Sequence, residues 1–398
     1  MGLRLDTRAL GREVDRYPGA LLGHCVLLLL VSVLALRSAS LTPDGGSLHF
    51  AERQLGWALA GLGCFFAASL VPYDRLGRRW PALWGLGLLA LVGVLALGTK
   101  VNGARSWFSL GPVRLQPSEL MKPLLTLALA HVAARLGPRL ATFGGLVRAA
   151  LVALVPFGLV LLQPDLGTAL CFVPISLAIV FAGGARLRHL LGALAGALAC
   201  LPVVWCFLLA EYQKLRILSF LDRDEHALGG AYQVTQSVIA IGSGGLLGRG
   251  AGQGTQGPLG FLPERHTDFV FAVVCEDWGL LGGALVLGLY ASLVALLLEQ
   301  AHRTRDPEGR GILVGLAAVT ATQVVVNVGM VLGVMPVTGI PLPLLSYGGS
   351  SLVASMLGFG LAASVARHRS RVTLAPGAPR EAPERRGTGR AERAILGA

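Results

Sequence analysis

Several ionisable side chains are concentrated in FLPERHTDFVF (261–271), immediately before a long apolar run. Glu264, His266 and Asp268 lie within five positions of one another in this stretch. If Pro263 is the first helical residue, Glu264 and Asp268 lie four apart on one helix face. A carboxylate there can act as a general base when its pKa suits the proton that it takes. The same carboxylates would also stabilise a helix start electrostatically, and the sequence leaves both interpretations open.

A second group of polar residues opens another apolar segment, in QPSELMK. Gln116 comes first, and Glu119 and Lys122 follow three residues apart, so that they share a helix face and can form an ion pair. Lys122 is also one of three cations, with Arg105 and Arg249, that could hold an anionic group. Arginine does so through bidentate hydrogen bonds to phosphate. These residues therefore suggest a site for a phosphorylated ligand.

Other polar residues have structural explanations that compete with functional ones. Asp165 in QPDLGT can cap the helix that follows it, and Trp107 can belong to an interfacial aromatic belt. Side chains expected to pair or hydrogen-bond inside a helix bundle are Glu276 with Asp277 and Gln323 with Asn327. The sequence contains no H-E-x-x-H motif and no His/Cys cluster, so a dedicated metal cage is not expected.

The elements that position these residues are membrane-spanning helices. Hydrophobic residues make up 54% of the 398 positions and charged residues only 14%, against about 25% charged in soluble domains. Apolar runs of about 18 residues recur, which predicts an all-α, polytopic integral membrane protein with about ten spans. The expected spans lie near 19–36, 54–71, 80–98, 117–135, 146–162, 166–184, 190–210, 268–298, 312–335 and 350–367.

Basic residues in the short loops predict the orientation of these spans. The formal net charge is +12, and arginine is concentrated on one side, which places both termini in the cytoplasm. We expect a cytoplasmic segment over 1–18, a membrane domain over 19–370 and a disordered basic tail over 371–398. A large extracytoplasmic loop spans 211–267 and includes an amphipathic helix within YQVTQSVIAIGSGGLLGRG. The groups around Lys122, Asp165 and Asp268 then all face outward.

Six segments together resemble the SEDS family (shape, elongation, division and sporulation) of bacterial membrane proteins. They run in family order over nearly the whole membrane domain, and the elongation-type members resemble PERHTDF and PVTGIPLPLLSYGGSS more closely than division-type members do. The segments are SAS after the first span, NGARSWFSLGPVRLQPSELMK, QPDLGTAL, YQVTQSVIAIGSGGLLGRG, FLPERHTDFVFAVVCEDWGLLG and GMVLGVMPVTGIPLPLLSYGGSS. CEDWG departs from the family, which more often has two glutamates there.

The resemblance implies a peptidoglycan glycosyltransferase that polymerises lipid II at the outer face of the bacterial cytoplasmic membrane. It also implies a class B penicillin-binding protein as partner transpeptidase, other cell-elongation proteins as further partners, and dependence on a divalent cation (Mg²⁺ or Mn²⁺). Asp268 matches the essential acid of the family, and Trp107, Glu119 and Lys122 match other functional positions.

Our hypothesis from these residues is that Asp268 is the general base while Arg105 and Lys122 bind the pyrophosphate leaving group. Gln116, Arg249, Glu264 and His266 are further candidates for substrate contacts. The main alternatives are a lipid II flippase, a division-type glycosyltransferase and a non-catalytic scaffold that recruits the transpeptidase.

Overall fold

The computed structural model describes residues 7–40, 49–101, 104–111, 113–199, 201–222, 230–257 and 259–372. A helix lies at each of the ten predicted spans, which confirms the all-α membrane fold. The helices at those spans are α1 (Thr7–Ala39), α2 (His49–Leu70), α4 (Trp80–Leu97), α5 (Pro117–Leu136), α6 (Phe143–Leu161), α7 (Leu166–Ala182), α8 (Leu187–Ala199) with α9 (Leu201–Val203), α12 (Val270–Arg303), α13 (Pro307–Val331) and α14 (Gly349–Val372). The predicted tail over 371–398 lies almost wholly outside the described residues.

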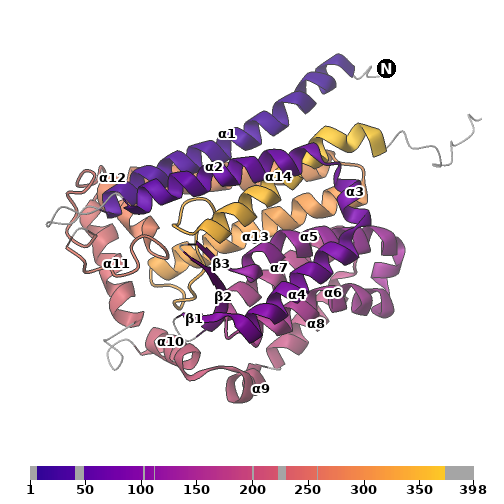
Figure 1. Ribbon diagram of the computed structural model, residues 1–398. Helices are drawn as coiled ribbons and strands as arrows, with labels where there is room; N and C mark the ends of the chain where they lie inside the picture. The colour runs from indigo at the N-terminus through magenta and orange to yellow at the C-terminus, as the bar shows by residue number, and fades with distance from the viewer. Residues whose placement is uncertain are drawn as a thin grey trace, which may run out of the picture.

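Eight helical stretches of the described chain are long and apolar enough to cross a membrane. They are Tyr17–Ala39, Trp80–Leu97, Pro117–Ala141, Phe143–Leu161, Leu187–Phe207, Val270–Arg303, Pro307–Val331 and Gly349–His368. The shorter apolar helix α7 packs inside the bundle against α13 and α5. Helix α2 carries Glu52 and Arg53 near its start and lies along α14 (Figure 1).

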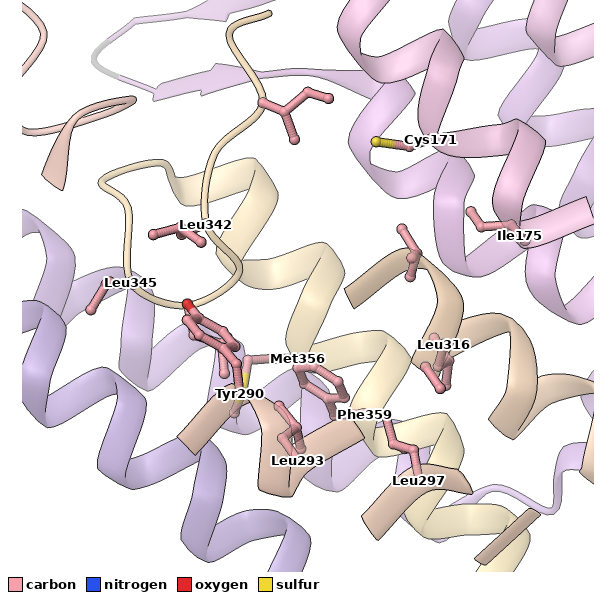
Figure 2. Close-up of a cluster of buried hydrophobic side chains, with 14 of the residues drawn as sticks. Cys171, Ile175, Tyr290, Leu293, Leu297, Leu316, Leu342, Leu345, Met356 and Phe359 are labelled. Atoms are coloured by element: carbon pink, nitrogen blue, oxygen red, sulfur yellow. The ribbon is translucent and has the colours of Figure 1, made fainter. Parts of the chain in front are cut away.

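The centre of the bundle is a cluster of apolar side chains from α12, α13 and α14. Tyr290, Leu293 and Leu297 of α12 lie against Met356 and Phe359 of α14 (Figure 2). The Tyr290 hydroxyl donates a hydrogen bond of 2.6 Å to the carbonyl oxygen of Pro343, in the loop before α14. Because lipid is as apolar as these side chains, close packing and such hydrogen bonds hold the helices together. This core fixes the loop over 332–348 that reaches the candidate site.

A small sheet lies at one end of the bundle and was not predicted. Strands β1 (Thr99–Val101), β2 (Ala104–Leu110) and β3 (Val113–Leu115) form an antiparallel sheet in the order β1-β2-β3. The segment contains β-branched and aromatic residues, which favour strands, but the expected spans leave it as a connection between residues 98 and 117. Ser350 joins the sheet to the bundle, since its hydroxyl donates to the Arg114 carbonyl and accepts from the Gln116 amide.

The long segment between α9 and α12 is folded rather than open. It contains α10 (Glu211–Leu221) and the predicted amphipathic helix, α11 (Gly230–Gly244). Both helices lie at the same end of the bundle as the sheet, whereas α3 (Tyr73–Arg78), the start of α1 and the end of α14 lie at the other end (Figure 1). The two ends of the molecule therefore carry different structures.

Helix α12 begins at Val270, close to the predicted start of the span at 268, so Pro263 is not the first helical residue. Residues before it form turns that are held by other contacts: the Phe269 amide donates to the Glu264 carbonyl, and the Tyr347 amide donates to the His266 carbonyl. These bonds replace helical ones, and Glu264 and Asp268 do not share a helix face.

A break in α12 at Gly279 admits the loop that follows α11. Gly279 has φ +67°, and a side chain there would meet the backbone of Leu246 and Gly248 at 2.4–2.5 Å. The freed backbone groups are satisfied by that loop, because Leu280 donates to the Gly245 carbonyl and Gly250 donates to the Asp277 carbonyl. Interrupted helices are tolerated within a membrane only when their backbone groups are satisfied in this way.

Candidate functional site

The carboxylate of Asp268 lies in a partly buried space between α10, α12 and the loop over 332–348. Its backbone carbonyl accepts a hydrogen bond of 2.9 Å from Asn327 of α13, whose amide group also donates to Ile340. A methyl group placed on Gly339 would lie 3.7 Å from Asp268 Oδ2 and 3.7 Å from Arg216 Nη1. Asn327 thus fixes the backbone of the residue, and its side chain faces the space beside Gly339.

The electrostatic surroundings of Asp268 suit a base that works near neutral pH. Burial is the main cause that raises the pKa of this carboxyl from 3.8 to about 6. The negative charge of Glu264 raises the pKa further, and the positive charge of Arg216 lowers it. At pH 7 most molecules carry the ionised, proton-accepting form, and its basicity is greater than that of an exposed aspartate.

Glu264 and His266 are held in the turn that precedes α12. Glu264 Oε2 accepts a hydrogen bond of 2.9 Å from the Thr267 hydroxyl. The His266 ring stacks on Phe50 with centroids 4.2 Å apart and lies edge-on to Tyr347. Burial lowers the pKa of His266, which favours the neutral ring at pH 7. These contacts give His266 a packing role and leave Glu264 to act on Asp268 through its charge.

The residues of QPSELMK lie at two depths: Glu119 and Lys122 lie inside the bundle, and Gln116 lies nearer its surface. Lys122 Nζ lies 2.6 Å from Glu119 Oε1 in a buried ion pair, beside a cavity of about 20 Å³ that Gln323 also lines. Gln116, nearer the surface, donates a 2.8 Å hydrogen bond to Asp165. The structure thus brings Glu119 and Lys122 together and links Gln116 to Asp165.

Asp165 caps α7, as the sequence suggested. Its Oδ1 accepts from the Thr168 amide at 3.1 Å, and burial raises the pKa of its carboxyl. The adjacent carbonyl of Pro164 accepts hydrogen bonds from the side chains of Tyr212 and Gln213, which dock α10 on the turn between α6 and α7. The capping turn therefore also positions α10.

Of the remaining predicted residues, Arg105 and Trp107 lie on the sheet, and Arg249 lies in the loop that follows α11. Arg105 and Trp107 belong to β2, where the Arg105 guanidinium is partly exposed and donates a 3.3 Å hydrogen bond to the Leu95 carbonyl. Arg249 is exposed and lies beside Glu276, since its backbone amide donates to the Glu276 carbonyl. That contact is about two helical turns into α12, so Arg249 is not grouped with Asp268.

The acidic pair of CEDWG binds the loop that follows α11, rather than pairing within the bundle. The Glu276 carboxylate accepts hydrogen bonds from the backbone amides of Thr255, Gln256 and Gly257, at 2.6, 2.9 and 3.2 Å. Asp277 interacts in the same way with Ser38 and with the backbone of Gly252. Gln323 and Asn327 also differ from the prediction, because Asn327 bonds to loop carbonyls and Gln323 lines the interior cavity.

Arg216 is the main site residue that the sequence argument missed. It lies on α10 with its guanidinium over the Tyr212 ring, 5.6 Å from the centroid. The signal was present, because EYQKLR places Tyr212 and Arg216 four residues apart, which is helical spacing. Arg216 lies within the loop predicted over 211–267, for which the sequence predicted a helix only within YQVTQSVIAIGSGGLLGRG.

The described residues do not form a cage for a divalent cation. Among them, no group of three or more His, Cys, Asp or Glu side chains is arranged to hold a metal ion. A magnesium ion usually keeps several waters and is often bound by one or two carboxylates together with substrate phosphates.

Comparison with known sequences identifies the family. The profile of the FtsW/RodA/SpoVE family, described as "Cell cycle protein", matches residues 17–371. The chain is a member of the FtsW/RodA/SpoVE family. The chain is 40% identical over 345 residues to peptidoglycan glycosyltransferase MrdB of Escherichia coli K12, covering 86% of this chain and 91% of that protein. It is 36% identical over 351 residues to stage V sporulation protein E of Bacillus subtilis, with coverages of 86% and 95%.

Solved structures of the FtsW/RodA/SpoVE family have the same fold. The crystal structure of the rod shape-determining protein RodA from Thermus thermophilus superposes with a TM-score of 0.66 at 36% identity, covering 88% of this chain and 96% of that one. A chain of a peptidoglycan synthase complex, studied for how it coordinates polymerization and crosslinking, gives a TM-score of 0.75 at 41% identity, with coverages of 88% and 97%. These matches confirm the polytopic membrane fold and the family resemblance found from the sequence motifs.

Proposed function

We propose that this protein is a peptidoglycan glycosyltransferase of the elongation type that polymerises lipid II into glycan strands. The observation that carries the proposal is Asp268, a carboxylate whose pKa of about 6 suits a general base. The relatives named MrdB and FtsW are peptidoglycan glycosyltransferases, and the resemblance to the RodA type is the stronger one. The proposal therefore rests on the activity of the relatives and on the chemistry of this site.

In the proposed reaction, a sugar hydroxyl of one substrate attacks the anomeric carbon of a lipid-linked donor. The new glycosidic C–O bond forms as the bond between the anomeric carbon and the diphosphate oxygen breaks, and the diphosphate leaves with that electron pair. Asp268 accepts the proton of the attacking hydroxyl and later releases it to water. A single displacement of this kind inverts the anomeric carbon and needs no protein nucleophile.

Positive charge must stabilise the departing diphosphate. Arg105 is the candidate on β2, at the sheet end of the bundle, and Trp107 and Gln116 are candidates for contacts with the sugar or peptide of the substrate. Lys122 is a weaker candidate, because its ammonium is already paired with buried Glu119. A divalent cation, Mg²⁺ or Mn²⁺, would supply further positive charge at the diphosphate.

The proposed orientation places the Asp268 end of the bundle outside the cytoplasmic membrane, with both termini in the cytoplasm. The distribution of arginine supports it, as does the position of α3 and of the helical ends of α1 and α14 at the opposite end. A class B penicillin-binding protein is the proposed partner, supported by the similarity to a chain of a synthase complex that joins polymerization to crosslinking.

A lipid II flippase is the second candidate, favoured by three polar side chains, Glu119, Lys122 and Gln323, that line a small and mostly apolar cavity within the bundle. Purified protein in detergent separates the two functions, since detergent micelles have no leaflets to cross. We expect glycan strands from lipid II and Mg²⁺ or Mn²⁺, more with the partner present and none after chelation with EDTA. If the protein makes no glycan strands under any of these conditions but moves lipid II across the bilayer of vesicles, the flippase function would be supported.

A further inference from the structure

The positive charge of Arg216 faces the Asp268 carboxylate across Gly339. Both charged groups lie 3.7 Å from the same point beside the Gly339 α-carbon, although the two residues come from different elements, 52 positions apart in sequence. Gly339 has φ +73° and no side chain, so nothing from this residue separates the two groups. Any side chain there would enter the space that they share.

The helix that carries Arg216 is docked by specific contacts. Tyr212 and Gln213, in the first turn of α10, both donate to the Pro164 carbonyl, and Gln213 also caps the helix by accepting from the Ala210 amide at 3.0 Å. The Tyr212 ring lies under the Arg216 guanidinium. Such a stack orients the planar group and leaves its N–H donors directed elsewhere. Arg216 is thus held at the site from the opposite side to α12.

The other charges around Asp268 act in the opposite sense to Arg216. Glu264, on the same turn, is negative and disfavours an ionised Asp268. The loop over 332–348 contributes Gly339, and α13 contributes the uncharged Asn327, which binds the backbone of Asp268 and leaves its carboxylate free for other partners. His266, also on the same turn, has a lowered pKa that favours its neutral ring at pH 7. Among the described residues around the carboxylate, Arg216 is the one cation that stabilises its charge.

We propose that Arg216 is a positioning residue for the reaction, which keeps the Asp268 carboxylate ionised and turned toward the space beside Gly339. The role of Asp268 as a base rests on the proposed function, whereas its pairing with Arg216 does not. The pairing makes α10 part of the active site, so that undocking α10 from the Pro164 turn would raise the pH at which Asp268 ionises.

The direct test is the titration of Asp268 in the purified protein, followed by infrared difference spectroscopy of its protonated carboxyl group. Asp268→Asn assigns the band. We expect a midpoint near pH 6 in the wild type and an upward shift of about one unit in Arg216→Gln, because an opposite charge at this range lowers a carboxyl pKa by about that much. Arg216→Lys should keep the wild-type midpoint.

A matched control lies on the same helix. Lys214 is paired with Glu211 at 2.9 Å, and Lys214→Gln removes one positive charge from α10 without touching the site, so its midpoint should not move. Tyr212→Leu keeps the charge of Arg216 but removes its support, and should raise the midpoint by less than Arg216→Gln does. This variant also covers the case in which Arg216→Gln does not fold.

Polymerisation of lipid II gives the second readout. With the midpoint raised by about one unit, Arg216→Gln should be about fivefold slower than wild type at pH 6 and nearly equal at pH 8. An unchanged Asp268 midpoint in Arg216→Gln, or an equal shift in Lys214→Gln, overturns the pairing. If the midpoints shift as expected but neither the wild type nor any variant polymerises lipid II, the pairing of Arg216 with Asp268 is supported and the proposed function is wrong.

Discussion

The loop over 251–262 should be released when Glu276 is replaced. Glu276 is 1% exposed, and its carboxylate accepts three backbone hydrogen bonds from that loop at 2.6–3.2 Å. A hydrogen bond to a charged group contributes about 1.5–3 kcal/mol. Because the freed backbone amides can bond to water, we take about 1 kcal/mol for each of the three bonds, the net value of an ordinary hydrogen bond, and expect Glu276→Ala to lose about 3 kcal/mol in the free energy of loop docking.

This loss corresponds to an increase of about a hundredfold in the open population of the loop. Chymotrypsin cleavage after Phe261, which is 45% exposed in the docked loop, measures this population when opening is faster than cleavage. We expect cleavage about a hundredfold faster in Glu276→Ala, and about tenfold faster in Glu276→Gln, which retains one accepting oxygen.

The matched control is Glu299→Gln, a change on the exposed side of the same helix that removes only a surface pair with Arg303. Its cleavage rate should equal that of the wild type. Cleavage at the wild-type rate in Glu276→Ala would refute the argument, because it would mean that the three hydrogen bonds do not hold the loop.

Three further predictions concern charge and backbone. The polymerisation rate should rise with pH through about 6 as Asp268 ionises, which a pH–rate profile measures. The contribution of Asp268 to the free energy of unfolding should fall as the pH rises from about 4 to 6, because its folded pKa lies above its unfolded value of 3.8. Thermal unfolding as a function of pH measures this opposite trend. Lys122→Met should cost about 3–5 kcal/mol of stability by leaving Glu119 unpaired, and adding Glu119→Gln should restore most of it in thermal unfolding; equal stability of the single and double variants would contradict this. Gly279→Ala should lower the yield of folded protein in size-exclusion chromatography, because a side chain there collides with backbone at 2.4 Å; a normal elution profile would contradict it.

The membrane helices could be predicted from the sequence because their signal is local. A run of apolar residues identifies a span without knowledge of its neighbours, and the predicted cap at Asp165 lies where its span begins. The sheet at 99–115 was missed because its strands are short and two of them have only three residues, which gives little periodicity to read.

Contacts between distant segments could not be predicted from local signals. Helix propensity at Pro263 suggested a helix start, but the bond from the Tyr347 amide to His266 holds a turn there instead. Arg216 reaches Asp268 only because α10 docks on Pro164, 52 residues before Arg216 in sequence. The acidic residue itself was identified through the family motif, while its partners across Gly339 became visible only in the fold.

The central claim is that Asp268 takes a proton during lipid II polymerisation. The most direct measurement is the single-turnover rate of glycan formation by purified Asp268→Asn at pH 7.5, next to wild type and to Glu299→Gln, with thermal unfolding of each. We predict a loss of about 10²–10⁴-fold for Asp268→Asn alone, with stability equal to or above that of wild type because a buried charge has been removed. Polymerisation by Asp268→Asn at the wild-type rate would contradict the account.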